Sequence, residues 1–248
     1  MTEAAAIGVA GQQRLLRNGL IVVAFALGAW AWAGGLLPSI VARWDDIAYL
    51  APQHMQLVAI SGGLAVVIGV PLGVLLTRRG IRRYGDIVLQ GLNIGATIPT
   101  LAVLALSMSL LGIGNRPAIF GLFVATILPI VANTLAGIRA VPSHLIEAAT
   151  GMGMSTRQML WQVELPNAMF VIYAGIRTAL AINVGTVPLA FLIGGGGLGE
   201  LIFRGIALNE FGMMLAGAIP TAMLAILVDF IMGQMQFWTI PRGVNPLR

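Results

Sequence analysis

The chain has 248 residues, of which 58% are hydrophobic and only 9% are charged, and its formal net charge is +5. Soluble domains usually carry about 25% charged residues, so a chain this apolar lacks the polar surface of a soluble protein, and lipid is its expected solvent. All 14 basic residues are arginines in short clusters between apolar runs. This pattern follows the positive-inside rule of membrane proteins and argues against nucleic-acid binding.

Six apolar runs are long enough to cross a bilayer, because a spanning helix needs about 20 apolar residues. In chain order they cover residues 19–37, 55–76, about 87–111, 117–138, about 168–193 and about 211–235. They predict an all-α, polytopic membrane bundle of about six transmembrane helices. The first run resembles a signal peptide, with a cleavage-like Ala31-Trp32-Ala33, but it exceeds the usual apolar core of about 7–15 residues. We therefore expect an uncleaved helix.

The arginines also predict orientation. If six spans place both chain ends in the cytoplasm, ten arginines lie in cytoplasmic segments and three in outer segments. The ten are Arg14, Arg17, Arg78, Arg79, Arg82, Arg83, Arg139, Arg157, Arg242 and Arg248, and the three are Arg43, Arg116 and Arg204. We therefore expect a cytoplasmic segment 1–18, a first helix and outer loop 19–54, a bundle core 55–235 and a cytoplasmic tail 236–248.

Prolines interrupt several of these runs and remove helix hydrogen bonds, which spanning helices tolerate where neighbours or water satisfy the freed carbonyls. These prolines are Pro99, Pro129, Pro188 and Pro220. They mark either kinks and gates beside a transport pathway or ordinary packing kinks, and the sequence leaves both interpretations open.

The segment 139–166, between the fourth and fifth runs, is too polar to span and falls on the cytoplasmic side. It is rich in helix formers. Ser143 and Ser155 are candidate N-caps, and Pro166 is expected to end the second helix. The sequence therefore predicts two short cytoplasmic helices.

Small residues occupy the junction of these two helices. Gly151 and Gly153 favour a break or a tight turn there. Ala148, Ala149 and Gly153 would let another protein surface approach closely. We interpret the junction as a docking site for a partner.

The same segment resembles the EAA loop of the membrane subunits of binding-protein-dependent ABC importers. That pattern is Glu-Ala-Ala, three residues, Gly, nine residues, an aliphatic residue, any residue, and Leu-Pro. The matching positions are Glu147, Ala148, Ala149, Gly153, Val163, Leu165 and Pro166. Val163 in place of the more usual Ile is the only departure. The resemblance implies a type I ABC importer transmembrane fold in which Glu147 to Gly153 form the coupling helix.

This resemblance also implies a set of partners in a bacterial inner membrane. They are two ABC ATPase subunits carrying ATP and magnesium, a second permease subunit that is identical or homologous, and an extracytoplasmic substrate-binding protein. No cofactor or metal is expected in this chain. The sequence contains no lysine and hence no P-loop of the usual type, so ATP hydrolysis is expected in the separate ATPase.

Two further segments, 174–179 and 191–206, resemble importers of quaternary-ammonium osmoprotectants such as glycine betaine, choline and carnitine. Residues 97–100 and 128–130 fit the same group. Methionine importers share a similar glycine-rich segment, so methionine or another small zwitterion remains an alternative cargo. The few aromatic residues, among them Trp30, Trp32, Trp44 and Tyr49, form an expected interfacial belt, and we expect any aromatic cage in the binding protein.

The glycine-rich segment contains Gly194, Gly195, Gly196, Gly197 and Gly199. It satisfies the dinucleotide pattern G-x-G-x-x-G, but no strand precedes it and no acidic residue follows at the required distance. We expect flexible backbone at the outer mouth that contacts the binding protein or forms a gate. The alternative is close helix packing through small residues.

Two opposite charges fall within the last two spans. Arg177 lies in the fifth run and Asp229 in the sixth, at depths that differ by about one helical turn. We hypothesise that they form an ion pair that locks the two spans together. The alternative is that Arg177 extends to cytoplasmic water.

Other function classes find less support. Cysteine is absent, and His54 and His144 lack metal-ligand spacing and are expected in loops. A secondary transporter driven by an ion gradient would need intramembrane carboxylates and often inverted repeats. A membrane-embedded enzyme would need a cluster of catalytic side chains. The sequence shows neither pattern.

Overall fold

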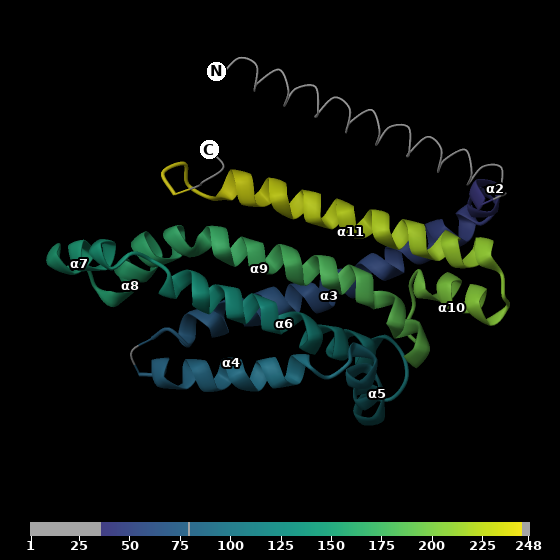
Figure 1. Ribbon diagram of the computed structural model, residues 1–248, viewed down its shortest axis with the longest axis horizontal. Coiled ribbons are helices and arrows are strands. Elements are labelled where there is room, and N and C mark those ends of the chain that lie inside the picture. Colours follow the sequence, from purple (N-terminus) through teal and green to yellow (C-terminus); the bar gives the residue numbers. More distant parts are fainter. Residues whose placement is uncertain (1–35, 79, 245–248) are drawn as a thin grey trace, which may run out of the picture.

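The computed structural model describes residues 36–78 and 80–244, and these residues form helices and connecting turns without a strand (Figure 1). In chain order the elements are α2 (Leu36–Val41), α3 (Trp44–Leu75), α4 (Arg82–Ala96), α5 (Thr100–Leu111), α6 (Asn115–Arg139), α7 (Ser143–Gly151), α8 (Thr156–Met159), the π-helical turn η1 (Leu160–Glu164), α9 (Leu165–Thr186), the 3-10 helix η2 (Val187–Ile193), α10 (Gly199–Ala207) and α11 (Phe211–Thr239).

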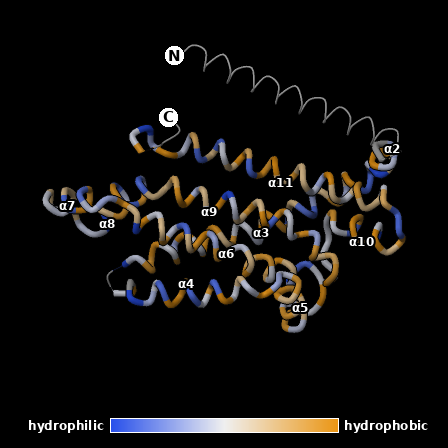
Figure 2. Tube along the Cα trace, viewed as in Figure 1, coloured by the Kyte–Doolittle hydropathy of each residue, from blue (hydrophilic) through white to orange (hydrophobic). Residues whose placement is uncertain are grey.

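Four helical segments of the described chain are long and apolar enough to cross a membrane, or five if α4 and α5 together count as one bent span. They are 44–75, 115–139, 156–193 and 211–239. Hydrophobic residues predominate along them, and hydrophilic residues gather towards the helix ends (Figure 2). The predicted run 19–37 lies outside the described residues except for its last two positions. The all-α membrane bundle is therefore confirmed, and its helix count fits approximately.

Helix α6 lies at the centre of the bundle and packs against α3 and α9, while α11 packs against α9. Its residues Ile130, Val131 and Leu135 are almost fully buried. Glycines allow the close helix contacts that small residues provide in membranes. A Cβ added to Gly175 of α9, for example, would lie 2.4 Å from the Cβ of Asn133.

Helix α3 begins at Trp44, eleven residues before the predicted start at residue 55, so the expected outer loop up to residue 54 is wrong in its last part. Asp45 and Asp46 lie in the first turn of α3, where negative charge complements the helix dipole. The helix also accommodates Pro52. The predicted start was defined by hydropathy alone, so it missed the polar first part of α3.

His54 was expected in a loop and lies instead within α3, fully buried. Its Nε2 atom is 3.1 Å from the carbonyl oxygen of Val184 in α9. This tertiary hydrogen bond satisfies one ring nitrogen inside the bundle, whereas Nδ1 is buried without a hydrogen-bond partner among the described residues. His144, also expected in a loop, is an exposed residue of α7.

The third predicted span is a pair of helices. Helices α4 and α5 meet at 94°, and Pro99 is the N-cap residue of α5 rather than a kink within one helix. Pro188 likewise lies at the start of η2, where the α-helix changes to a 3-10 helix. Pro129 and Pro220 lie inside α6 and α11, as expected.

Candidate functional site

The segment between α6 and α9 forms two short helices, α7 and α8, that lie at one end of the bundle (Figure 1). The turn between them contains Gly153 at a φ of 73°, a conformation that glycine adopts without strain. Ser155 then caps α8: the backbone N–H of Gln158 donates to its Oγ at 3.3 Å, and its own backbone N–H donates to Gln158 Oε1 at 2.9 Å. This is the capping box of a helix start.

Ser143 is not the N-cap of α7, contrary to expectation. It is the first helical residue, and Pro142 occupies the cap position with an extended ψ of 134°. The fixed φ of proline suits this position, and its missing N–H costs nothing at a helix start.

Pro166 does not end the second helix, again contrary to expectation. Helix α8 continues through η1 into α9, and Pro166 lies in the first turn of α9. The wider π turn changes the hydrogen-bond register just before the proline. The side-chain amide of Asn167 also donates to the carbonyl oxygen of Val163 at 2.7 Å.

The helix pair presents a mixed polar and apolar surface. Glu147, Ala148 and Gly153 are exposed, whereas Ala149 is buried. Two large apolar side chains, Met152 and Trp161, are 69% and 63% exposed. Gly151, Val163 and Leu165 complete the loop, the last two being half-buried. Small, apolar and acidic groups on a protruding loop can dock into a complementary protein groove.

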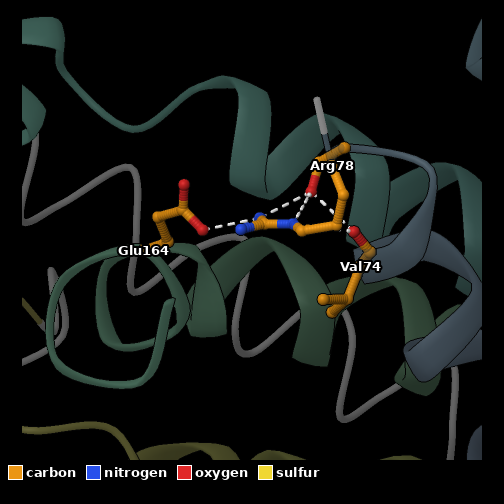
Figure 3. A network of polar contacts seen from close by, with 4 residues as sticks. Val74, Arg78 and Glu164 are labelled. Carbon is orange, nitrogen blue, oxygen red and sulfur yellow. Dashed lines mark hydrogen bonds and ion pairs between the residues drawn. The ribbon is translucent and has the colours of Figure 1, made fainter. Parts of the chain in front are cut away.

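An ion pair ties this loop to the C-terminal end of α3 (Figure 3). The Arg78 guanidinium donates to Glu164 Oε2 at 2.6 Å, and to Thr77 Oγ1 at 2.6 Å. Its Nε donates to the carbonyl oxygen of Val74 at 3.3 Å. The two charged side chains are only 23% and 15% exposed. The sequence analysis did not anticipate this pair, because 86 residues separate its members and no local pattern connects them.

Arg177 and Asp229 contact one another between α9 and α11. Arg177 Nε donates to Asp229 Oδ1 at 3.0 Å and Nη2 donates to Oδ2 at 2.7 Å, a bidentate geometry. Nη1 also donates to Gln236 Oε1 at 3.3 Å. The guanidinium is therefore turned towards α11. Its partner is a carboxylate, as hypothesised, and that the pair locks the two helices remains a prediction.

The glycine-rich segment is closely packed, which favours the packing alternative over open, flexible backbone. A Cβ added to Gly199 would lie 2.1 Å from the carbonyl oxygen of Pro188, and one on Gly195 would lie 2.9 Å from that of Ala190. The backbone N–H of Gly196 donates to Asn115 Oδ1 at 3.0 Å. The two glycines with positive φ are Gly194 and Gly197.

A buried polar cluster joins three helices and was also missed. The Asn183 side-chain amide of α9 donates to Ser61 Oγ of α3 and to Thr126 Oγ1 of α6, both at 2.9 Å. Its members are spread over more than 120 residues, so spacing alone could not connect them. Among the described residues no group of His, Cys, Asp and Glu is arranged to hold a metal ion.

This arrangement of spanning helices is a known fold, seen in a solved ABC transporter. A solved inward-facing structure of the MetNI methionine ABC transporter superposes with a TM-score of 0.70 over 79% of this chain and 96% of that chain, at 24% sequence identity. A similarity at this identity establishes the fold.

The family is then defined by sequence. Residues 69–240 match the family model described as "Binding-protein-dependent transport system inner membrane component". The chain belongs to this family.

Two curated relatives are similar over most of their length. The osmoprotectant import permease protein OsmY of Salmonella typhimurium strain LT2 is 50% identical over 212 residues, covering 86% of this chain and 89% of the relative. The glycine betaine/carnitine/choline transport system permease protein OpuCB of Bacillus subtilis strain 168 is 37% identical over 203 residues, covering 82% and 93%. The osmoprotectant subfamily suggested by residues 174–179 and 191–206 agrees with these names.

Proposed function

We propose that this chain is the membrane-spanning permease subunit of an ATP-driven importer for quaternary-ammonium osmoprotectants such as glycine betaine, choline or carnitine. The observation that carries the proposal is the 50% identity to an osmoprotectant import permease over 86% of the chain. Other relatives, at 37–42% identity, are carnitine, choline or glycine betaine transport permeases, which supports the same cargo class.

The coupling step is assigned to α7 and its turn. Two ATPase subunits would hold ATP and magnesium and grip the exposed surface around Glu147, Ala148 and Gly153. Closure of the ATPases on ATP binding would push α7 and switch the pathway from inward-open to outward-open, and hydrolysis would reset it. Because α8, η1, α9 and η2 form one continuous helical segment of 38 residues, movement of the loop acts directly on a spanning helix.

The complete importer would contain this chain, a second permease subunit, two ATPases and an extracytoplasmic binding protein. The chain would cross the inner membrane of a bacterium with both ends in the cytoplasm, as the arginine distribution favours. Gly194 to Gly199 and the prolines Pro99, Pro129 and Pro188 remain candidates for gating segments around the outer half of the pathway.

The alternatives are weaker. The similarity to a methionine transporter, at 24% identity, concerns the fold and does not favour methionine as cargo. A transporter driven by an ion gradient would place several carboxylates near the midplane. In the four long helices that the structure describes, Asp229 is the only carboxylate that lies away from a helix end.

The proposal is tested by uptake into proteoliposomes that contain this chain, its ATPase and its second permease, with the binding protein added outside. Radiolabelled glycine betaine should accumulate only when ATP is inside the vesicles together with the ATPase. Methionine, delivered by its own binding protein as the control, should not accumulate. Uptake at the full rate without the ATPase, or accumulation of methionine alone, would overturn the proposal.

A further inference from the structure

The Arg177–Asp229 pair lies well inside two spanning helices, away from their ends. Asp229 precedes the end of the 29-residue α11 by ten residues, or about 15 Å of helical rise. Arg177 follows the start of α9 by twelve residues, or about 18 Å. Charged groups at such depths are costly in hydrocarbon and face a water-filled space or a protein partner.

The pair is also accessible. The Arg177 side chain is 33% exposed and the Asp229 side chain is 44% exposed, although the two form an ion pair. Because a charge at this depth is costly in lipid, this accessibility argues that the face of α9 and α11 carrying the pair is turned away from lipid, towards the transport pathway or the second subunit that borders it.

Two open cavities share the ion pair as part of their walls, each of about 580 Å³. Volumes of about 300–1,000 Å³ are typical of small-molecule sites. Phe170 and Thr178 line the first cavity, and Phe230 and Gln234 line the second. Each cavity therefore combines an aromatic ring and a neutral polar group with the same two opposite charges.

The charges are held in place before any ligand arrives. The Arg177 guanidinium contacts Asp229 and Gln236, and it lies against the backbone of α11 at Gly233, where an added Cβ would be 3.4 Å from its Cζ atom. Gln236 is itself 2% exposed, and its amide nitrogen lies 3.4 Å from the carbonyl oxygen of Phe170. Such fixed polar groups lose little entropy when they bind a ligand.

From this geometry we infer that the Arg177–Asp229 pair is a transit site for a zwitterion, with Arg177 facing the carboxylate of the cargo and Asp229 facing its quaternary ammonium. The methylated nitrogen offers no hydrogen bond, so it is attracted by the carboxylate charge and by one aromatic ring, Phe170 in the first cavity or Phe230 in the second. The site rests on the proposed function and adds to it a residue-level basis for distinguishing betaine-like cargo from choline, which lacks a carboxylate.

The test measures initial uptake rates of glycine betaine and of choline in proteoliposomes holding the complete importer. Each cargo is supplied by its saturated binding protein. In Arg177→Gln the ratio of the betaine rate to the choline rate should fall at least about tenfold, because only betaine loses a charged hydrogen-bond partner. In Asp229→Asn both rates should fall together, because both cargoes carry the quaternary ammonium.

The double variant Arg177→Gln/Asp229→Asn, which leaves no unpaired charge in the membrane, controls for misfolding. It should assemble and should transport both cargoes slowly, with the betaine preference lost. An unchanged betaine-to-choline ratio in Arg177→Gln, with rates either normal or equally reduced, would overturn the site and leave the ion pair a helix lock. Failure of the wild-type importer to move either cargo would instead overturn the proposed function.

Discussion

Gly199 lies at the start of α10, directly against the backbone of η2. Its missing side chain is what allows the contact, because a Cβ there would lie 2.1 Å from the carbonyl oxygen of Pro188 and 2.7 Å from the Pro188 carbonyl carbon. A backbone carbonyl cannot rotate away as the end of a flexible side chain can. The residue therefore fixes how closely α10 approaches η2.

We expect Gly199→Ala to destabilise the protein by about 1–3 kcal/mol, the usual cost of overpacking. Gly63→Ala, in α3, is the control, because an added Cβ there meets nothing within 4 Å. The free energy of unfolding in detergent micelles measures both. Equal stability of the two variants would show that the contact at Gly199 does not constrain the fold.

At the scale of single residues, the sequence predicted those that are recognised by local spacing or by their own chemistry. The seven matching positions of the loop are defined by spacing, and Arg177 and Asp229 stand out because ionisable residues are rare inside spans. The Asn183 cluster and the burial of His54 depend on tertiary contacts with residues more than 100 positions away. Neither leaves a pattern in a single sequence.

At the scale of the helices, the most informative feature is the contact between the α7–α8 loop and the end of α3. Arg78 lies three residues beyond the end of α3 and holds Glu164 in η1, the turn through which α8 passes into α9. The pair therefore links two spanning segments at the point where the loop between α6 and α9 ends. Its low exposure distinguishes it from the Arg139–Asp86 pair, in which Asp86 is 77% exposed.

Neutralising Glu164 should destabilise the protein by about 1–3 kcal/mol, because Arg78 would remain largely buried without its carboxylate. Glu164→Gln and Arg78→Gln should each show this loss in chemical unfolding, and the double variant should lose less than their sum. Asp86→Asn should change stability by less than about 0.5 kcal/mol, as expected for an exposed pair. Strict additivity of the two single variants would contradict a direct interaction.

Helix boundaries were less predictable than the helices themselves. Apolar runs identified α6 and α11 within a few residues, because lipid-spanning helices must be continuously apolar. The start of α3 was placed too late, since its first turns are polar and contain Pro52. The sequence could not predict that the helix continues past Pro166, because the π turn that precedes the proline forms only in the folded chain.

At the scale of the whole molecule, we propose that the chain forms one half of a membrane pathway whose energy is supplied by a separate ATPase. Its fold is that of ABC importer membrane subunits, and its family membership rests on residues 69–240. The account depends on the α7–α8 loop being on the cytoplasmic side, where an ATPase can hold it.

The most direct test uses the absence of cysteine from the sequence. Met152→Cys, at the exposed tip of the loop, is treated with a membrane-impermeant maleimide in inside-out and right-side-out vesicles. The reagent should label inside-out vesicles only, and a bound ATPase should protect the thiol. Labelling from the exterior, or equal labelling with and without the ATPase, would contradict the account.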